Sequence, residues 1–157
     1  MTYDASRATI VFDDDSAQAQ RFSLPENFLD TVVQMTLRQS YFAHIQSQVT
    51  IEIALATREV IQSLNHQTMG KNVPTDVLSY PAHATEREIR LAADSGSVFL
   101  GEMVLCLEAI EQDARTDEIP FLRELAFVAS HGVLHLLGYE HGEEMFALQD
   151  DVCDNIR

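Results

Sequence analysis

Alternating apolar and polar residues mark the clearest strand of the chain. Residues 48–55 read QVTIEIAL, so four apolar side chains face one side of an extended segment and the other four face the opposite side. Weaker patterns predict three further strands, at residues 7–12, 75–80 and 98–107. The third of these is apolar almost throughout. The chain therefore carries about four strands, spread over most of its length.

Apolar residues at helical spacing predict helices between and after these strands. The first runs from residue 23 to about 41, with Ser23 as its cap and Pro25 in its first turn. Thr57 opens a second helix, which ends near residue 65 and is followed by a loop at residues 66–74. Further helices are expected at residues 108–115 and 143–156, and a helical turn at 86–92.

The longest predicted helix begins at residue 117 or 120 and ends near residue 137. Its apolar residues cover more than one face, which is typical of a buried helix. Gly138 follows it and fits the left-handed conformation that ends many helices. Together the elements predict an α+β fold, a single domain over residues 1–157 with one mixed sheet and helices packed on it.

The sequence composition indicates the cellular compartment in which we expect the protein to act. No apolar run is long enough to span a membrane, and the N-terminus lacks the basic and apolar regions of a secretion signal. The only two cysteines, Cys106 and Cys153, make no disulfide framework. We therefore expect a cytoplasmic protein that does not contact membranes.

The net charge of −15 limits which partners the protein can bind. One lysine and nine arginines stand against 25 acidic residues. This balance opposes general binding to a phosphate backbone, and we expect no DNA partner. It favours attraction to basic partners instead.

Three of the six histidines lie within one short stretch, SHGVLHLLGYEHGEE, at residues 130–144. His131 and His135 are four residues apart, so they share one face of the long helix near its C-terminal end. Gly138 lets the chain turn back, which brings His141 to a third ligand position. Three imidazoles with one open tetrahedral position are typical of a catalytic zinc ion, although nickel and copper also bind such a set.

The same stretch matches the zinc-protease pattern HExxHxxGxxH at every fixed position except one. Gly132 stands where a protease carries its glutamate. That carboxylate takes a proton from water and passes it to the leaving amine, which a glycine cannot do. Peptide hydrolysis by this route is therefore disfavoured. A metal that polarises an oxygen and supplies hydroxide suits a phosphodiester instead.

Read as a whole, HGVLHLLGYEH resembles the motif HGxLHLxGYDH of the YbeY family, metal-dependent endoribonucleases that act in ribosomal RNA maturation. Residues 64–81, LNHQTMGKNVPTDVLSYP, are similar to the family's LNxxYRxKDxPTDVLSFP. Residues 100–106, LGEMVLC, are similar to its LGDIVIC. The three segments occur in the family's order, so the resemblance covers most of the chain.

The resemblance implies a single-strand-directed endoribonuclease of small-subunit ribosomal RNA maturation. Its substrate would be single-stranded ribosomal RNA, and its partner the small ribosomal subunit or a ribosomal protein. One Zn²⁺ would be held by His131, His135 and His141. His131, Lys71 and Glu102 are the implied catalytic residues, because Lys71 and Glu102 match the basic and acidic residues of the other two motifs. The motif residues Thr75, Asp76 and Ser79 are expected to build the fold, since short polar side chains readily bond to nearby backbone.

One departure from the family's pattern bears directly on catalysis. Met69 stands where the family has an arginine that suits a phosphate, and Thr68 stands where it has a tyrosine. Either Lys71, Arg58 or Arg123 replaces that arginine in space, or the nuclease activity is weakened or lost. The alternative functions are a non-catalytic ribosome-assembly factor with a structural metal and a protease-like metallohydrolase. Gly132 argues against the second.

Overall fold

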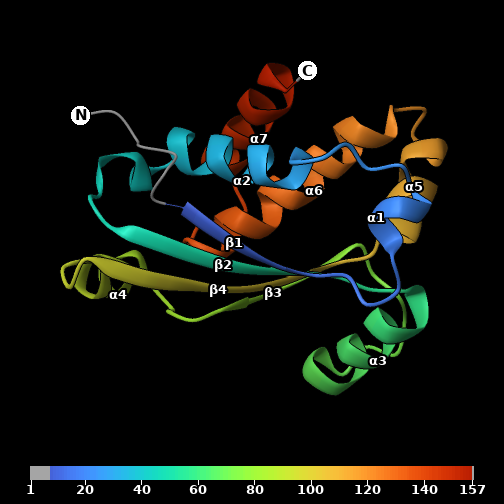
Figure 1. The fold of residues 1–157 in the computed structure, drawn as a ribbon, viewed down its shortest axis with the longest axis horizontal. Helices are drawn as coiled ribbons and strands as arrows, with labels where there is room; N and C mark the ends of the chain where they lie inside the picture. The colour runs from blue at the N-terminus through green and yellow to red at the C-terminus, as the bar shows by residue number, and fades with distance from the viewer. Residues whose placement is uncertain (1–7, 157) are drawn as a thin grey trace.

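Four strands form one mixed sheet in the computed structural model, which describes residues 8–156 (Figure 1). The strands are β1 (Ala8–Asp13), β2 (Gln48–Leu55), β3 (Val77–Pro81) and β4 (Ser97–Leu105), in the order β1-β2-β4-β3. β2 pairs in parallel with both β1 and β4, whereas β3 is antiparallel to β4. The predicted mixed sheet is confirmed. Arg7, the first residue of the first predicted strand, lies outside the described residues.

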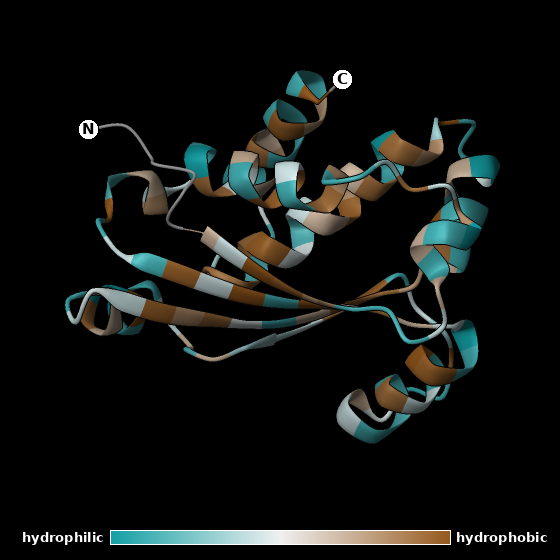
Figure 2. Ribbon diagram, in the orientation of Figure 1, coloured by the Kyte–Doolittle hydropathy of each residue, from teal (hydrophilic) through white to brown (hydrophobic). Residues whose placement is uncertain are grey.

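Helices cover the two faces of the sheet unequally. Figure 1 shows α2 (Phe28–Gln39), α6 (Phe121–Leu136) and α7 (Glu143–Asn155) on one side and α3 (Arg58–Met69) on the other. The main core lies beneath the first group, and it includes the alternate apolar residues of β2 together with buried residues of α2 and α6. Figure 2 shows the hydrophobic residues along β2 and β4 and on α6. A smaller core under α3 contains Ile61, Leu78 and Val104.

The long predicted helix is α6, and its surroundings explain why its apolar residues cover more than one face. Nine of its 16 residues are buried, between the sheet on one side and other helices on the other. Pro120 stands at its N-terminal cap position, and Gly138, at a φ of 92°, follows its end as predicted. No helix within residues 8–156 combines the length and the apolar composition needed to cross a lipid bilayer.

The start of the first long helix was predicted wrongly. Ser23 and Asn27 both have left-handed backbones, with φ of 51° and 63°, so the chain turns twice before α2 begins at Phe28. A short helix, α1 (Gln18–Arg21), precedes these turns and was not predicted. The carboxylate of Asp14 starts it by accepting hydrogen bonds from two backbone N–H groups, at 2.7 and 2.9 Å. A 3-10 turn, η2 (Tyr41–His44), follows α2.

The other boundaries differ by a few residues. The Thr57 hydroxyl caps α3 by accepting from the Val60 N–H at 3.3 Å, as predicted. The helix then continues to Met69, so residues 66–69 are helical rather than part of a loop. The predicted turn at 86–92 is a full helix, α4 (Glu86–Ala93), and α5 spans Leu107–Thr116. Pro81 closes β3, which is possible because β3 is an edge strand and pairs with β4 alone.

Candidate metal centre

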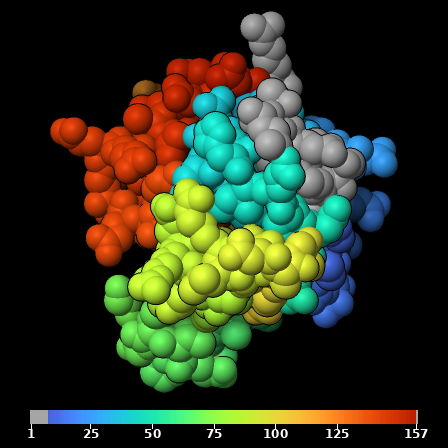
Figure 3. Space-filling model, turned by 90° about the vertical axis from the view of Figure 1, so that its left-hand side faces the viewer, coloured from blue at the N-terminus to red at the C-terminus, as the bar shows by residue number. Residues whose placement is uncertain are grey.

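Three imidazole rings meet at the C-terminal end of α6. His131 and His135 lie on its last turns, and His141 lies in the loop that leads to α7. Their Nε2 atoms are 3.0, 3.1 and 3.2 Å apart in the three pairs. The structure therefore brings together the three histidines whose sequence spacing predicts a metal site. Figure 3 shows the C-terminal part of the chain (orange-red) and α3 (green) on the same exposed side of the molecule.

The chemistry and spacing of these nitrogens fit one zinc ion. Zinc–imidazole bonds of about 2.0–2.1 Å in a tetrahedron separate two ligand nitrogens by roughly 3.3 Å, close to the distances found here. Metal binding needs neutral imidazoles. Burial, and then the charge of His135, lower the pKa of His131 to about 4. Burial also lowers the pKa of His135. These two rings are therefore neutral at neutral pH and present lone pairs.

Local hydrogen bonds hold the turn between α6 and the third histidine. The N–H of Gly138 donates to the His135 carbonyl at 3.0 Å, and the N–H of Tyr139 donates to the Leu134 carbonyl at 3.0 Å. The Tyr139 hydroxyl accepts from the Tyr41 N–H at 3.0 Å, while the Tyr41 hydroxyl donates to the Leu137 carbonyl at 2.8 Å. This pair of tyrosines ties the turn to η2. The position of His141 is thus set by contacts outside its own loop.

Gly132 lies where α6 packs closely on the sheet. A Cβ atom at this position would overlap the Sδ atom of Met103 and would lie 3.3 Å from the Ser79 hydroxyl. The Ser79 hydroxyl itself points to the Gly132 carbonyl, at 3.4 Å. A side chain at this position would fit only if Met103 moved aside. A glutamate here would therefore compete with Met103 for the same space.

Contacts of the PTDVLS segment fit the fold-building role expected for it. Besides the contact between Ser79 and α6, the Asp76 carbonyl accepts from the Cys106 N–H at 2.9 Å. The Thr75 hydroxyl donates to the Asp76 carboxylate at 3.3 Å. The bond between Asp76 and Cys106 joins the residue before β3 to the residue after β4.

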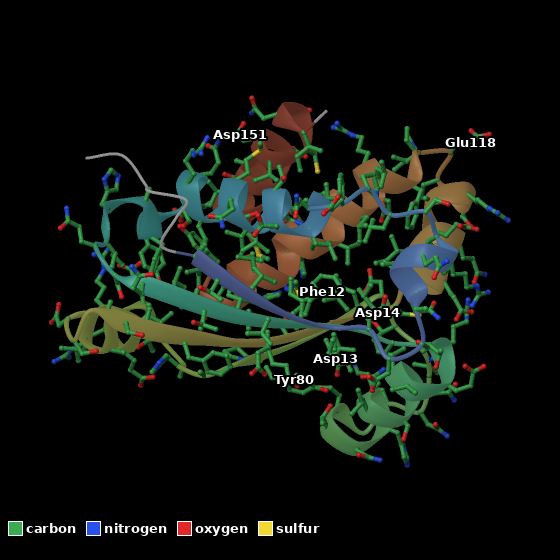
Figure 4. All side chains as sticks on the ribbon, viewed as in Figure 1. Phe12, Asp13, Asp14, Tyr80, Glu118 and Asp151 are labelled. Carbon is green, nitrogen blue, oxygen red and sulfur yellow. The ribbon has the colours of Figure 1, made fainter. Side chains whose placement is uncertain are left out.

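Glu102 does not lie with the histidines. Successive residues of a strand face opposite sides of a sheet, and its neighbour Met103 faces α6. The Glu102 side chain therefore points to the other face, where the sheet register sets it beside Glu52 and Tyr80. Figure 4 shows Tyr80 on that face, the side that also carries α3. Burial raises the pKa of Glu102, and the charge and hydrogen bond of Glu52 raise it further.

The basic residues named from the sequence are dispersed. Lys71 is exposed in the loop after α3, and Met69 is 52% exposed at the end of that helix. Arg58 begins α3, 11 residues or about 16 Å of helix from Met69, and donates to Gln112 at 2.6 Å. Arg123 lies in the first turn of α6, about 12 Å of helix before His131, and pairs with Asp154 at 3.0 Å. Neither arginine lies beside Met69, whereas Lys71 follows it by two residues.

One buried polar residue next to the site could not be recognised from the sequence. Gln149 is fully buried on the inner face of α7, and its amide Nε2 donates to the Phe127 carbonyl at 3.2 Å, one helical turn before His131 on α6. A polar residue at an apolar position of an amphipathic helix was the only signal for it, because Met145 and Val152 flank it at helical spacing.

Comparisons with known proteins identify the family of this chain. The family model described as Endoribonuclease YbeY matches residues 14–157. A relative called Endoribonuclease YbeY from Carboxydothermus hydrogenoformans is 40% identical over 118 residues, which cover 75% of this chain and 73% of the relative. Another of the same name from Persephonella marina is 31% identical over 141 residues, 86% of each. The solution structure of a Thermotoga maritima protein superposes with a TM-score of 0.60 at 25% identity, covering 94% of this chain and 89% of the other.

Proposed function

This chain belongs to the YbeY endoribonuclease family, and from that premise we propose that it is a zinc-dependent enzyme that cuts single-stranded RNA during maturation of the small-subunit ribosomal RNA. As a member of this family it is a hydrolase of RNA phosphodiester bonds. The cluster of three Nε2 atoms within 3.2 Å of one another is the observation that carries the metal dependence.

The proposed roles of the residues follow from their positions. His131, His135 and His141 would hold the zinc ion, which when bound supplies a Lewis acid and a nucleophile at neutral pH. His131 and His135 are half-buried whereas His141 is exposed, so an RNA strand can reach the cluster from the solvent side. Lys71 is the proposed phosphate contact, because it is the remaining basic residue of its motif and stands two positions after Met69.

The proposed partner is a basic protein of the small ribosomal subunit in the cytoplasm. Net charge supports this choice, since −15 repels RNA and attracts cationic surfaces. A cavity of about 480 Å³ beside the histidine loop is lined by four glutamates, Glu86, Glu140, Glu143 and Glu144. A basic partner docked there would let the ribosome, rather than this chain alone, hold the RNA near the histidines.

A second candidate function is a ribosome-assembly factor that binds the metal but does not cut RNA. The exposed Met69 favours it, because a methionine cannot stabilise charge on a phosphate as the family's arginine can.

Metal analysis and RNA cleavage by the wild type and His131→Ala separate the two. We expect about one zinc ion per wild-type chain, cleavage of single-stranded but not double-stranded RNA, and a loss of at least about 100-fold in His131→Ala. His44→Ala is the matched control, because His44 is exposed in η2 and lies outside the cluster. A zinc-loaded wild type that leaves RNA intact would instead support the assembly factor.

A further inference from the structure

Arginines gather around one cavity at the end of the molecule where α1, α3 and α5 lie (Figure 1). The cavity has a volume of about 590 Å³, which is within the range of small-molecule sites. Arg21, Arg58 and Arg115 line it, so three of the ten cationic residues of a chain with a net charge of −15 meet here. The cavity beside the histidine loop is instead lined by four glutamates and no arginine. Positive charge is thus concentrated in a cavity that none of the three clustered histidines lines.

Arg58 is the arginine of this cavity that has no acidic partner. It is the first residue of α3, where the helix dipole adds partial positive charge, and it is half-buried. Its guanidinium donates to the neutral amide oxygen of Gln112 at 2.6 Å. Arg58 also lines a neighbouring cavity with Asp76 and Asp113, but no carboxylate within residues 8–156 forms an ion pair with it. Most of its five N–H donors therefore remain available to an anion.

The other two arginines have partners that an anion can displace. Arg21 lies 3.3 Å from Glu108, and Arg115 lies 2.7 Å from Glu111. The two arginine side chains are 59% and 79% exposed. Ion pairs at such exposure contribute little to stability, because water and salt screen them. A ligand with more charge than a carboxylate can therefore recruit both arginines with little loss.

The chemistry of these donors favours a phosphate monoester. A guanidinium group bonds two phosphate oxygens at once. A monoester carries a charge of about −1.5 to −2 at pH 7 and three acceptor oxygens, whereas each phosphodiester of an RNA strand carries a single charge. We propose that this cavity binds a phosphate monoester, the group carried by a free nucleotide or by the 5′-phosphate end of an RNA strand. Arg58 is its principal contact, and Arg21 and Arg115 complete the site.

Paired ligands isolate the contribution of the phosphate group. Calorimetric titration of the full chain with guanosine 5′-monophosphate and with guanosine compares the same nucleoside with and without a monoester. Single-stranded RNA octamers with a 5′-phosphate or a 5′-hydroxyl distinguish an RNA end from a free nucleotide. All titrations are repeated in His131→Ala, and the octamers are compared in that variant alone, so that neither binding at the histidines nor cleavage affects the result.

Variants with opposite expected effects test the arginines. Arg58→Gln should weaken binding of the monophosphate about 10- to 100-fold, because it removes a charge-assisted pair of hydrogen bonds. Glu111→Gln should tighten it about two- to fivefold, because it frees Arg115 from a competing carboxylate. Arg38→Gln and Asp151→Asn are the matched controls, since both residues are exposed and line no part of the cavity. Neither control should change the affinity.

The results separate the proposed site from ordinary surface ion pairs. Guanosine bound as tightly as its monophosphate, no binding of the monophosphate at millimolar concentration, or an affinity unchanged in Arg58→Gln would overturn the proposal. Octamers bound equally with either end would overturn the choice of a monoester. An octamer bound only with its 5′-phosphate supports the proposal and identifies an RNA end as the ligand. Binding of the monophosphate but of neither octamer supports it and identifies a free nucleotide.

A second variant keeps the test decisive if Arg58→Gln does not fold. The Arg115 side chain is 79% exposed, so Arg115→Gln should fold and should also weaken binding of the monophosphate. Unchanged affinity in both Arg115→Gln and Glu111→Gln would refute the site. Binding that disappears in His131→Ala would place the phosphate at the histidines and would refute it as well.

Discussion

Gly132 separates this site from that of a zinc protease, and its packing can be tested by adding a single methyl group. Alanine normally stabilises a helix relative to glycine by about 1 kcal/mol. Here the new Cβ would meet Met103, so we expect Gly132→Ala to lower the free energy of unfolding by about 1–3 kcal/mol, measured by urea denaturation.

The paired variant Gly132→Ala/Met103→Ala provides the control for this clash. Removing the Met103 side chain removes the Sδ atom in the way, so the double variant should be less destabilised than the sum of the single variants. Additive losses, or a more stable Gly132→Ala, would contradict this prediction and show that Met103 or α6 shifts to make room for the methyl group.

The residues of the site differ in how far the sequence could predict them. His131, His135 and His141 could be found because their spacing and one glycine bring them together locally. The position of Gln149 could not, because α7 must first pack on α6 to bring its amide to the Phe127 carbonyl. The reason for Gly132 likewise lies on another element, in Met103 of β4.

Among the elements, β2 was predicted at its observed bounds because its burial alternates along all eight residues. The start of α2 was not, because Ser23 and Asn27 adopt left-handed backbones that non-glycine residues rarely take and that no local pattern announces. The end of α3 was missed since Gly70, rather than the polar residues before it, ends the helix. Strand and helix identity thus followed from periodicity, whereas boundaries depended on single backbone conformations.

The pairing of β2 with β4 sets two like charges side by side, at Glu52 and Glu102. Because the pKa of Glu102 is raised, the folded protein holds its proton more tightly than the unfolded chain does, so this carboxyl contributes less stability as the pH rises above about 4.5. Glu102→Gln removes the repulsion. We expect it to be more stable than the wild type at pH 7 by about a few tenths of a kcal/mol, and equally stable near pH 4.

Thermal unfolding between pH 4 and pH 7 measures the effect of Glu102 on stability, and an RNA cleavage assay measures its effect on catalysis. Glu52→Gln is the matched variant, because it relieves the same repulsion. Combined with Glu102→Gln, it should therefore bring no further gain in stability. Cleavage should persist in Glu102→Gln, since its side chain faces away from α6. If cleavage were lost while stability rose, Glu102 would act in catalysis as the family motif implies.

For the molecule as a whole, the net charge of −15 predicts opposite salt responses for its two proposed partners. Raising monovalent salt from about 50 to 200 mM screens long-range forces, so association with a basic ribosomal protein should slow, whereas association with naked single-stranded RNA should not. Stopped-flow measurements would give both association rates.

E143Q/E144Q, which alters two glutamates that line the acidic cavity, should slow protein association more than D150N/D151N, which removes the same charge farther along α7. Protein association that strengthens with salt, or that falls equally in the two variants, would exclude the cavity as the docking site.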